Sequence, residues 1–139
     1  MTGRLPESTL WLSVATVVAT VATAGSLWFS LGVGLTPCDL CWYQRILMYP
    51  LVVVLGVAAV EGRAAVLRTA LPLVAFGGSL AAYHSYLQAT VTECTLGGPC
   101  AAVQWQSPVL DLSIPNLSLV AFALLAVLLV GMQMRVGRR

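Results

Sequence analysis

Residues 112–134, LSIPNLSLVAFALLAVLLVGMQM, contain no Asp, Glu, Lys or Arg. A helix needs about 20 predominantly apolar residues to cross the hydrocarbon core of a bilayer, so this run is long enough by itself. Three further charge-free runs precede it, at 8–38, 46–60 and 69–92. The run at 46–60 is short and reaches a spanning length only when residues 42–45 are included. The sequence therefore predicts four transmembrane helices.

The composition supports the same class of protein. Hydrophobic residues make up 59% of the chain and charged residues only 9%, whereas about a quarter of an ordinary soluble domain is charged. We expect an all-α integral membrane four-helix bundle with helices at 10–33, 41–60, 69–89 and 115–134. These helices leave no room for a second domain, so residues 1–139 form one domain.

The first apolar run could instead be a secretory signal peptide. Its residues 22–24, Ala-Thr-Ala, resemble a small-residue cleavage site. However, the apolar pattern continues past this point to Leu35, and the segment before it carries a single basic residue, Arg4. We therefore expect an uncleaved first helix.

The basic residues predict the orientation of the bundle. All seven are arginines, and six fall in segments that the four helices leave on one side: Arg4, Arg63, Arg68, Arg135, Arg138 and Arg139. By the positive-inside rule this side is cytoplasmic and holds both termini. The opposite side receives two outer loops, around 36–40 and 89–113, and all four cysteines lie on this side. The net charge of +2 follows from this topology and does not indicate nucleic-acid binding.

The first outer loop leads into a Cys-x-x-Cys pair, Cys38 and Cys41. A dithiol near a helix N-terminus is favoured as thiolate because the positive end of the helix dipole faces the sulfur atoms. Arg45 lies four residues after Cys41, on the same helix face. A charge inside a membrane is costly and by default marks a functional site. We expect Arg45 to stabilise a thiolate or the anion of an electron acceptor; the alternative is an arginine that anchors the helix to lipid head groups.

The second outer loop holds the other cysteine pair, Cys94 and Cys100, around a Gly-Gly-Pro turn at 97–99. Such a turn can bring the two α-carbons within the 4.4–6.8 Å or so that a disulfide requires. This disulfide could be a static staple of the loop or, because a soluble partner can reach it, a redox-active bond. Such bonds persist in an oxidising compartment.

His84 is the only histidine of the chain and lies late in the third helix, at a depth near Arg45. It could be a packed polar residue, or it could donate a hydrogen bond to a bound polar head group such as a quinone carbonyl. Tyr49 is one turn from Arg45 and is a second candidate cofactor contact, although tyrosines are also typical of the membrane interface.

Residues 37–50, PCDLCWYQRILMYP, resemble the disulfide bond formation protein B family, and most closely its BdbC-like branch, in which a Cys-x-x-Cys-Trp-Tyr-Gln-Arg run opens the second helix. Beyond these residues the likeness rests on four spans and on cysteine-bearing outer loops. The pair Cys94 and Cys100 encloses five residues, fewer than in family members with a long loop.

The resemblance implies a quinone-dependent thiol-disulfide oxidoreductase of the bacterial cell membrane. Such an enzyme reoxidises an extracytoplasmic thioredoxin-fold disulfide oxidase and passes the electrons to ubiquinone or menaquinone. By resemblance, Cys94 and Cys100 exchange with the partner, and Cys100 then exchanges with the pair Cys38–Cys41. Cys41 delivers the electrons to the quinone beside Arg45.

Two alternatives stay open on the sequence. A vitamin-K-epoxide-reductase-like protein also has four helices and a Cys-x-x-Cys pair, although its active pair sits late in the bundle. A four-cysteine metal-binding membrane protein would use the same sulfur atoms as ligands. The absence of further ligands near the cysteines and the charge of Arg45 argue against coordination, so we expect no resident metal.

Overall fold

The computed structural model describes residues 7–90 and 100–138. Its four long helices are α1 (Glu7–Leu27), α2 (Asp39–Glu61), α3 (Leu67–Thr90) and α4 (Ile114–Gly137). Each is long and apolar enough to cross a membrane, and the described ranges contain no strand beyond one isolated bridge between Gln106 and Ser113. The prediction of an all-α, multi-pass membrane protein with four spans is confirmed.

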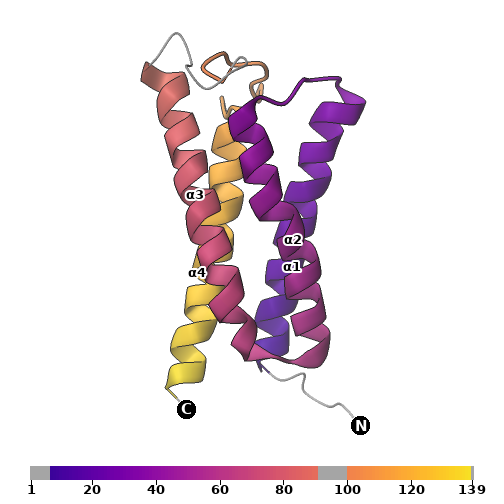
Figure 1. Ribbon diagram of the computed structural model, residues 1–139, viewed down its shortest axis with the longest axis vertical. Helices are drawn as coiled ribbons and strands as arrows, with labels where there is room; N and C mark the ends of the chain where they lie inside the picture. Colours follow the sequence, from indigo (N-terminus) through magenta and orange to yellow (C-terminus); the bar gives the residue numbers. More distant parts are fainter. Residues whose placement is uncertain (1–6, 91–99, 139) are drawn as a thin grey trace.

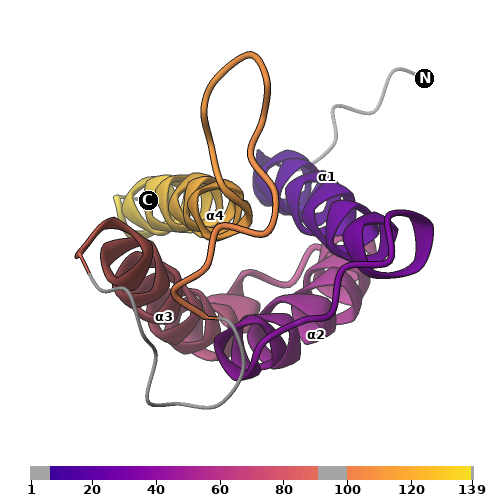
Figure 2. The ribbon, with the colours of Figure 1, turned by 90° about the horizontal axis from the view of Figure 1, so that it is seen from above.

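The four helices form a ring in which each packs against the next and α1 also packs against α4 (Figures 1 and 2). At one end of the ring, Arg135 of α4 forms an ion pair of 2.6 Å with Glu7 of α1. The guanidinium of Arg135 also lies over the ring of Trp11, 5.5 Å from its centroid. The α1–α2 connection and the segment 100–113 lie at the opposite end (Figure 1). Cys38, Cys41 and Cys100 are therefore far from the α1–α4 ion pair.

Side chains from all four helices fill the interior of the ring. The fully buried ones include Leu12, Leu51, Leu55, Phe122, Leu125 and Leu129. Helices α3 and α4 approach each other closely at Gly77, where an added Cβ would lie 2.2 Å from Cε1 and Cζ of Phe122. The glycine thus makes room for the aromatic ring, as small residues do at membrane helix interfaces.

Two helix ends border the half of the bundle that holds Cys38, Cys41 and Cys100. After Leu27, α1 continues as a π-helical segment, η1 (Trp28–Gly32), and such segments often occur at functional sites. Helix α2 begins at Asp39, because the carbonyl of Cys38 already accepts the backbone N–H of Trp42 at 3.0 Å. Cys38 is the N-cap residue of α2, so the cysteine pair occupies its first turn.

Candidate functional site

The Cys38–Cys41 pair is a dithiol whose two sulfur atoms are 3.0 Å apart. Cys38 precedes the spanning part of α2 and is buried, whereas Cys41 is half-buried. The hydrogen bond that Cys38 donates to the Cys41 sulfur, followed by burial, raises the pKa of Cys38 to about 12. Cys38 is therefore the thiol that keeps its proton, and Cys41 is the sulfur that receives the hydrogen bond.

His84 of α3 contacts this pair, Gln44 of α2 and the backbone of Cys100. Its Nε2 atom lies 3.8 Å from the Cys38 sulfur and 2.9 Å from the carbonyl oxygen of Cys100, while Nδ1 lies 3.1 Å from Nε2 of Gln44. A carbonyl can only accept, so Nε2 of His84 carries the proton, and Nδ1 accepts from the Gln44 amide. His84 thus holds the Cys100 backbone of the outer segment next to the first turn of α2.

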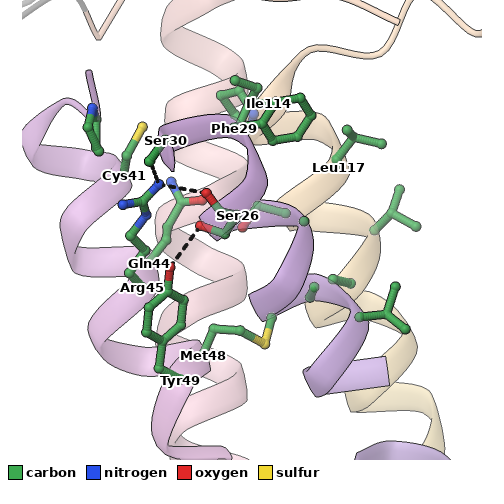
Figure 3. Close-up of a pocket in the computed structure, with 18 of the residues that line it drawn as sticks. Ser26, Phe29, Ser30, Cys41, Gln44, Arg45, Met48, Tyr49, Ile114 and Leu117 are labelled. Carbon is green, nitrogen blue, oxygen red and sulfur yellow. Dashed lines mark hydrogen bonds between the residues drawn. The ribbon is translucent and has the colours of Figure 1, made fainter. Parts of the chain in front are cut away.

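Arg45 is bound to the end of α1. Its Nη2 atom donates to the carbonyl oxygen of Ser26 at 3.0 Å and to the hydroxyl of Ser30, and its guanidinium lies 5.3 Å from the ring centroid of Trp42. The Tyr49 hydroxyl donates to the Ser26 hydroxyl at 3.1 Å. These contacts place a permanent positive charge at the junction between α1 and η1 (Figure 3).

Several of these groups border one cavity of about 460 Å³ between α1, α2 and α4. Its polar end is formed by residues from α1, η1, α2 and α3: Ser26, Ser30, Cys41, Gln44, Arg45, Tyr49 and His84. The rest of its wall is apolar and includes Val21, Ala121 and Leu124. In Figure 3 the Arg45 and Tyr49 side chains point across the cavity end toward α1, with Phe29 and Leu117 on the facing wall. The volume is in the range typical of small-molecule sites.

The structure brings together six of the seven site residues that the sequence suggested. Cys38, Cys41, Cys100 and His84 form one cluster, and Arg45 and Tyr49 lie on the cavity beside Cys41. The seventh, Cys94, and with it the predicted Cys94–Cys100 disulfide, lies outside the described residues.

Sequence reasoning missed three residues that complete the arrangement. Gln44 is buried and hydrogen-bonds His84. Ser26, through its carbonyl oxygen, and Ser30, through its hydroxyl, accept the hydrogen bonds of Arg45. A signal for Gln44 was present, since it is an uncharged polar residue three positions after Cys41 in an otherwise apolar helix. A single sequence gives no signal for which helix Arg45 contacts.

Comparison with known proteins agrees with this arrangement. A family model described as disulfide bond formation protein DsbB matches residues 7–132. The chain is 39% identical to the disulfide bond formation protein C of Bacillus subtilis, over 85% of this chain and 88% of the relative. It is 41% identical to a probable disulfide formation protein of Deinococcus radiodurans, over 90% of each chain. No solved structure gives a significant match. A chain with this family match and these relatives belongs to the disulfide bond formation protein B family.

Proposed function

We propose that this protein is a quinone-dependent thiol-disulfide oxidoreductase that reoxidises an extracytoplasmic dithiol oxidase of the thioredoxin fold. The single observation that carries the proposal is the position of Cys41. Its sulfur borders the cavity of about 460 Å³ and is also 3.0 Å from the sulfur of Cys38, which lies in the Cys100 cluster. The dithiol therefore connects the outer segment to a pocket between the helices.

The cavity fits a quinone on chemical grounds. A quinone head has two carbonyl acceptors on an apolar ring and carries an apolar tail. The polar end of the cavity offers N–H donors from Arg45 and Gln44, and the remaining wall, with residues such as Val21 and Leu124, is apolar. Ubiquinone and menaquinone both satisfy this description.

The residues of the chain have distinct tasks in this proposal. Cys100 and Cys94 accept two electrons from the dithiol of the partner by disulfide exchange, and a second exchange passes them to the Cys38–Cys41 disulfide and regenerates the outer one. A bound quinone supplies a two-electron, two-proton acceptor. Arg45, whose charge is permanent, stabilises the Cys41 thiolate on the cavity side. Cys38 keeps its proton until its sulfur re-forms the disulfide.

The orientation follows from the charge distribution. Six of the seven arginines lie in the segments that the sequence places at the end of the bundle opposite the cysteine pair. With that end in the cytoplasm, the cysteines face an oxidising compartment, where a soluble partner can reach the outer loop. The protein then acts in a bacterial cell membrane.

The alternatives are less well supported. The match to the disulfide bond formation family over residues 7–132 favours this proposal over a vitamin-K-epoxide-reductase-like protein. A four-cysteine metal-binding protein would give no role to Arg45, whose guanidinium sits 5.3 Å from the Trp42 ring and contacts α1.

The test is quinone reduction by the purified full-length protein in detergent, with a reduced thioredoxin-fold dithiol oxidase as electron donor. Absorbance of the quinone is followed with ubiquinone and menaquinone analogues. We expect multiple turnovers with at least one of them and none in the Cys41→Ala variant. Ser79→Ala is the matched control, because its hydroxyl lies on the exposed face of α3 and bonds only its own helix at Ala75. A wild-type protein that reduces neither quinone would contradict the proposal.

A further inference from the structure

A second, much smaller cavity adjoins the dithiol and shares Cys41 and His84 with the large pocket. It measures about 20 Å³ and is walled by Cys38, Cys41, His84 and Gln88, among others. A site needs roughly 10–15 Å³ to hold one water molecule, so a single small ligand or ion fits. The Oε1 atom of Gln88 is buried and has no hydrogen-bond partner among the described residues. The side chain that carries this oxygen lines the cavity together with the two cysteines and His84, so the cavity is a candidate site for a small ligand.

The donor atoms around this cavity match the geometry of a soft metal site. The Cys38 and Cys41 sulfur atoms and a ring nitrogen of His84 all lie within 4.8 Å of one another. Tetrahedral zinc, with bonds of about 2.3 Å to sulfur and 2.0–2.1 Å to nitrogen, places its ligand atoms about 3.5–3.8 Å apart. The Cys38 sulfur is 3.8 Å from Nε2 of His84. The two sulfur atoms, at 3.0 Å, need to separate by less than an ångström.

The helices preorganise these donors. Cys38 and Cys41 are three residues apart at the start of α2, and His84 and Gln88 are four apart on one face of α3, which packs against α2. This donor set differs from the four cysteines that the sequence suggested as a zinc site. The Gln88 oxygen or a water molecule would be the fourth ligand.

Charge and ligand softness select the ion. Two thiolates and a neutral imidazole carry a charge of −2, so a divalent cation gives a neutral complex, and burying a neutral group avoids the cost of burying a charge. Thiolate ligands select Zn²⁺ and related soft ions over Mg²⁺ and Ca²⁺. We propose that the reduced Cys38–Cys41 pair, together with His84, binds one divalent thiophilic metal ion, with Zn²⁺ as the fitting one.

Binding is balanced by proton movements within the cluster. Each thiol loses one proton, so two protons leave for each ion bound. The proton on Nε2 of His84 moves to Nδ1, and Nε2 exchanges its hydrogen bond to the Cys100 carbonyl for the metal. The Gln44 amide can follow this change, because after rotation its oxygen accepts from Nδ1–H. A metal site of this kind therefore releases the Cys100 backbone from His84.

The site exists only in one redox state. The Cys38–Cys41 disulfide has no thiolate to offer, so the oxidised protein cannot bind the ion. A bound ion in turn occupies both sulfur atoms that must join to release electrons. Zinc binding would therefore arrest the enzyme in the dithiol state. This arrest rests on the function proposed above, whereas the binding of zinc does not rest on it.

The direct test uses Co²⁺ as a spectroscopic probe and Zn²⁺ as competitor. The full-length protein carrying Cys94→Ala and Cys100→Ala is reduced, freed of reductant and titrated without oxygen. We expect one Co²⁺ per chain, the intense visible bands of tetrahedral cobalt, a sulfur-to-cobalt charge-transfer band, and displacement by Zn²⁺ but not by Mg²⁺. If this background does not fold, the Cys94→Ala protein serves in the same titration. Weak octahedral cobalt bands, or equal binding to the oxidised protein, would overturn the proposal.

Variants of residues in α3 test whether His84 binds the metal directly or affects binding only through the general structure of the helix. Loss of an outer-shell partner typically lowers metal affinity by 10–100-fold, so His84→Ala, which removes a direct ligand, should lower it by at least about 100-fold. His84→Gln is a second variant that keeps a polar side chain of similar length. Tyr83→Phe, at the adjacent and exposed position, is the matched control and should leave the affinity unchanged. Unchanged affinity in both His84 variants would contradict the assignment.

Quinone reduction in the presence of Zn²⁺ tests whether zinc binding arrests the enzyme in the dithiol state. Zinc should stop turnover of the wild-type protein, and a chelator should restore it. If Zn²⁺ binds as described but the metal-free protein reduces no quinone, the metal site stands and the proposed function fails. If the protein reduces quinone and Zn²⁺ neither binds nor inhibits, the function stands and the metal site fails.

Discussion

Replacing Arg45 by methionine should lower quinone use by this protein about 100- to 1,000-fold. The structure suggests why: Nη2 of Arg45 already bonds Ser26 and Ser30, while the rest of its planar group borders the cavity beside Cys41. Removing one preorganised donor from developing negative charge typically costs 10²–10³ in kcat, about 2.7–4 kcal/mol. Methionine is unbranched and fills most of the same space, so the loss reports charge and hydrogen bonding.

Arg45→Lys should be less severe. The ammonium group keeps the charge but has no planar fork, so it can reach either the α1 oxygens of Ser26 and Ser30 or the cavity. We expect a loss of about tenfold, which corresponds to about 1.4 kcal/mol. If quinone reduction falls in the order wild type, Arg45→Lys, Arg45→Met, the charge of Arg45 contributes to the activity and not only the shape of its side chain.

The assay is steady-state quinone reduction at varied quinone concentration, together with a single turnover of partner oxidation without quinone. The Arg45 variants should lose kcat/KM for quinone and keep the single-turnover rate, because disulfide exchange with the partner occurs at the outer loop. Arg68→Met is the control, since Arg68 is an exposed arginine at the start of α3. A normal kcat/KM for quinone in Arg45→Met would refute this role and leave the residue as a membrane anchor.

Two further predictions concern packing and thiol reactivity. Gly77→Ala should lower the free energy of unfolding by about 1–3 kcal/mol through overpacking, because the new Cβ would meet the buried Phe122 ring at 2.2 Å. Gly78→Ala is the control, because its new Cβ would lie at an ordinary 3.6 Å from the Phe122 Cβ; it should leave the melting temperature in detergent unchanged or higher. Equal losses of stability in both variants would contradict the packing argument. In the reduced protein at pH 8, iodoacetamide should modify Cys41 before Cys38. A pKa of about 12 keeps the Cys38 thiol protonated, and only the thiolate reacts. Mass spectrometry that finds Cys38 modified first would show that the Cys38 pKa is not raised.

The sequence predicted the fold well because membrane spans are set by local properties. Length, the absence of charge and a run of apolar side chains decide whether a segment crosses the bilayer, and all are visible in the residues of α4. The helix register also placed Cys41 and Arg45 on one face without further information. These features depend on a single helix.

The contacts of the site depend on pairs of helices, and these could not be predicted from periodicity. The sequence put His84 at about the depth of Arg45, but it did not predict that Gln44 and the Cys100 carbonyl are the partners of His84. It also gave no sign that α1 ends in a π-helical segment near Ser26. Such details follow from the rotation of each helix about its axis, which is fixed by packing against its neighbours.

The ring of Phe122 seated on Gly77 has a mechanical consequence for the whole bundle. Protein interiors are nearly incompressible, so α3 and α4 cannot approach each other further at this point. The seam between α1 and α4 is different: the Glu7–Arg135 ion pair fastens it at one end, and the large cavity lies along its other half. We therefore expect a lipid-borne molecule to enter the cavity sideways from the bilayer, through the seam between α1 and α4.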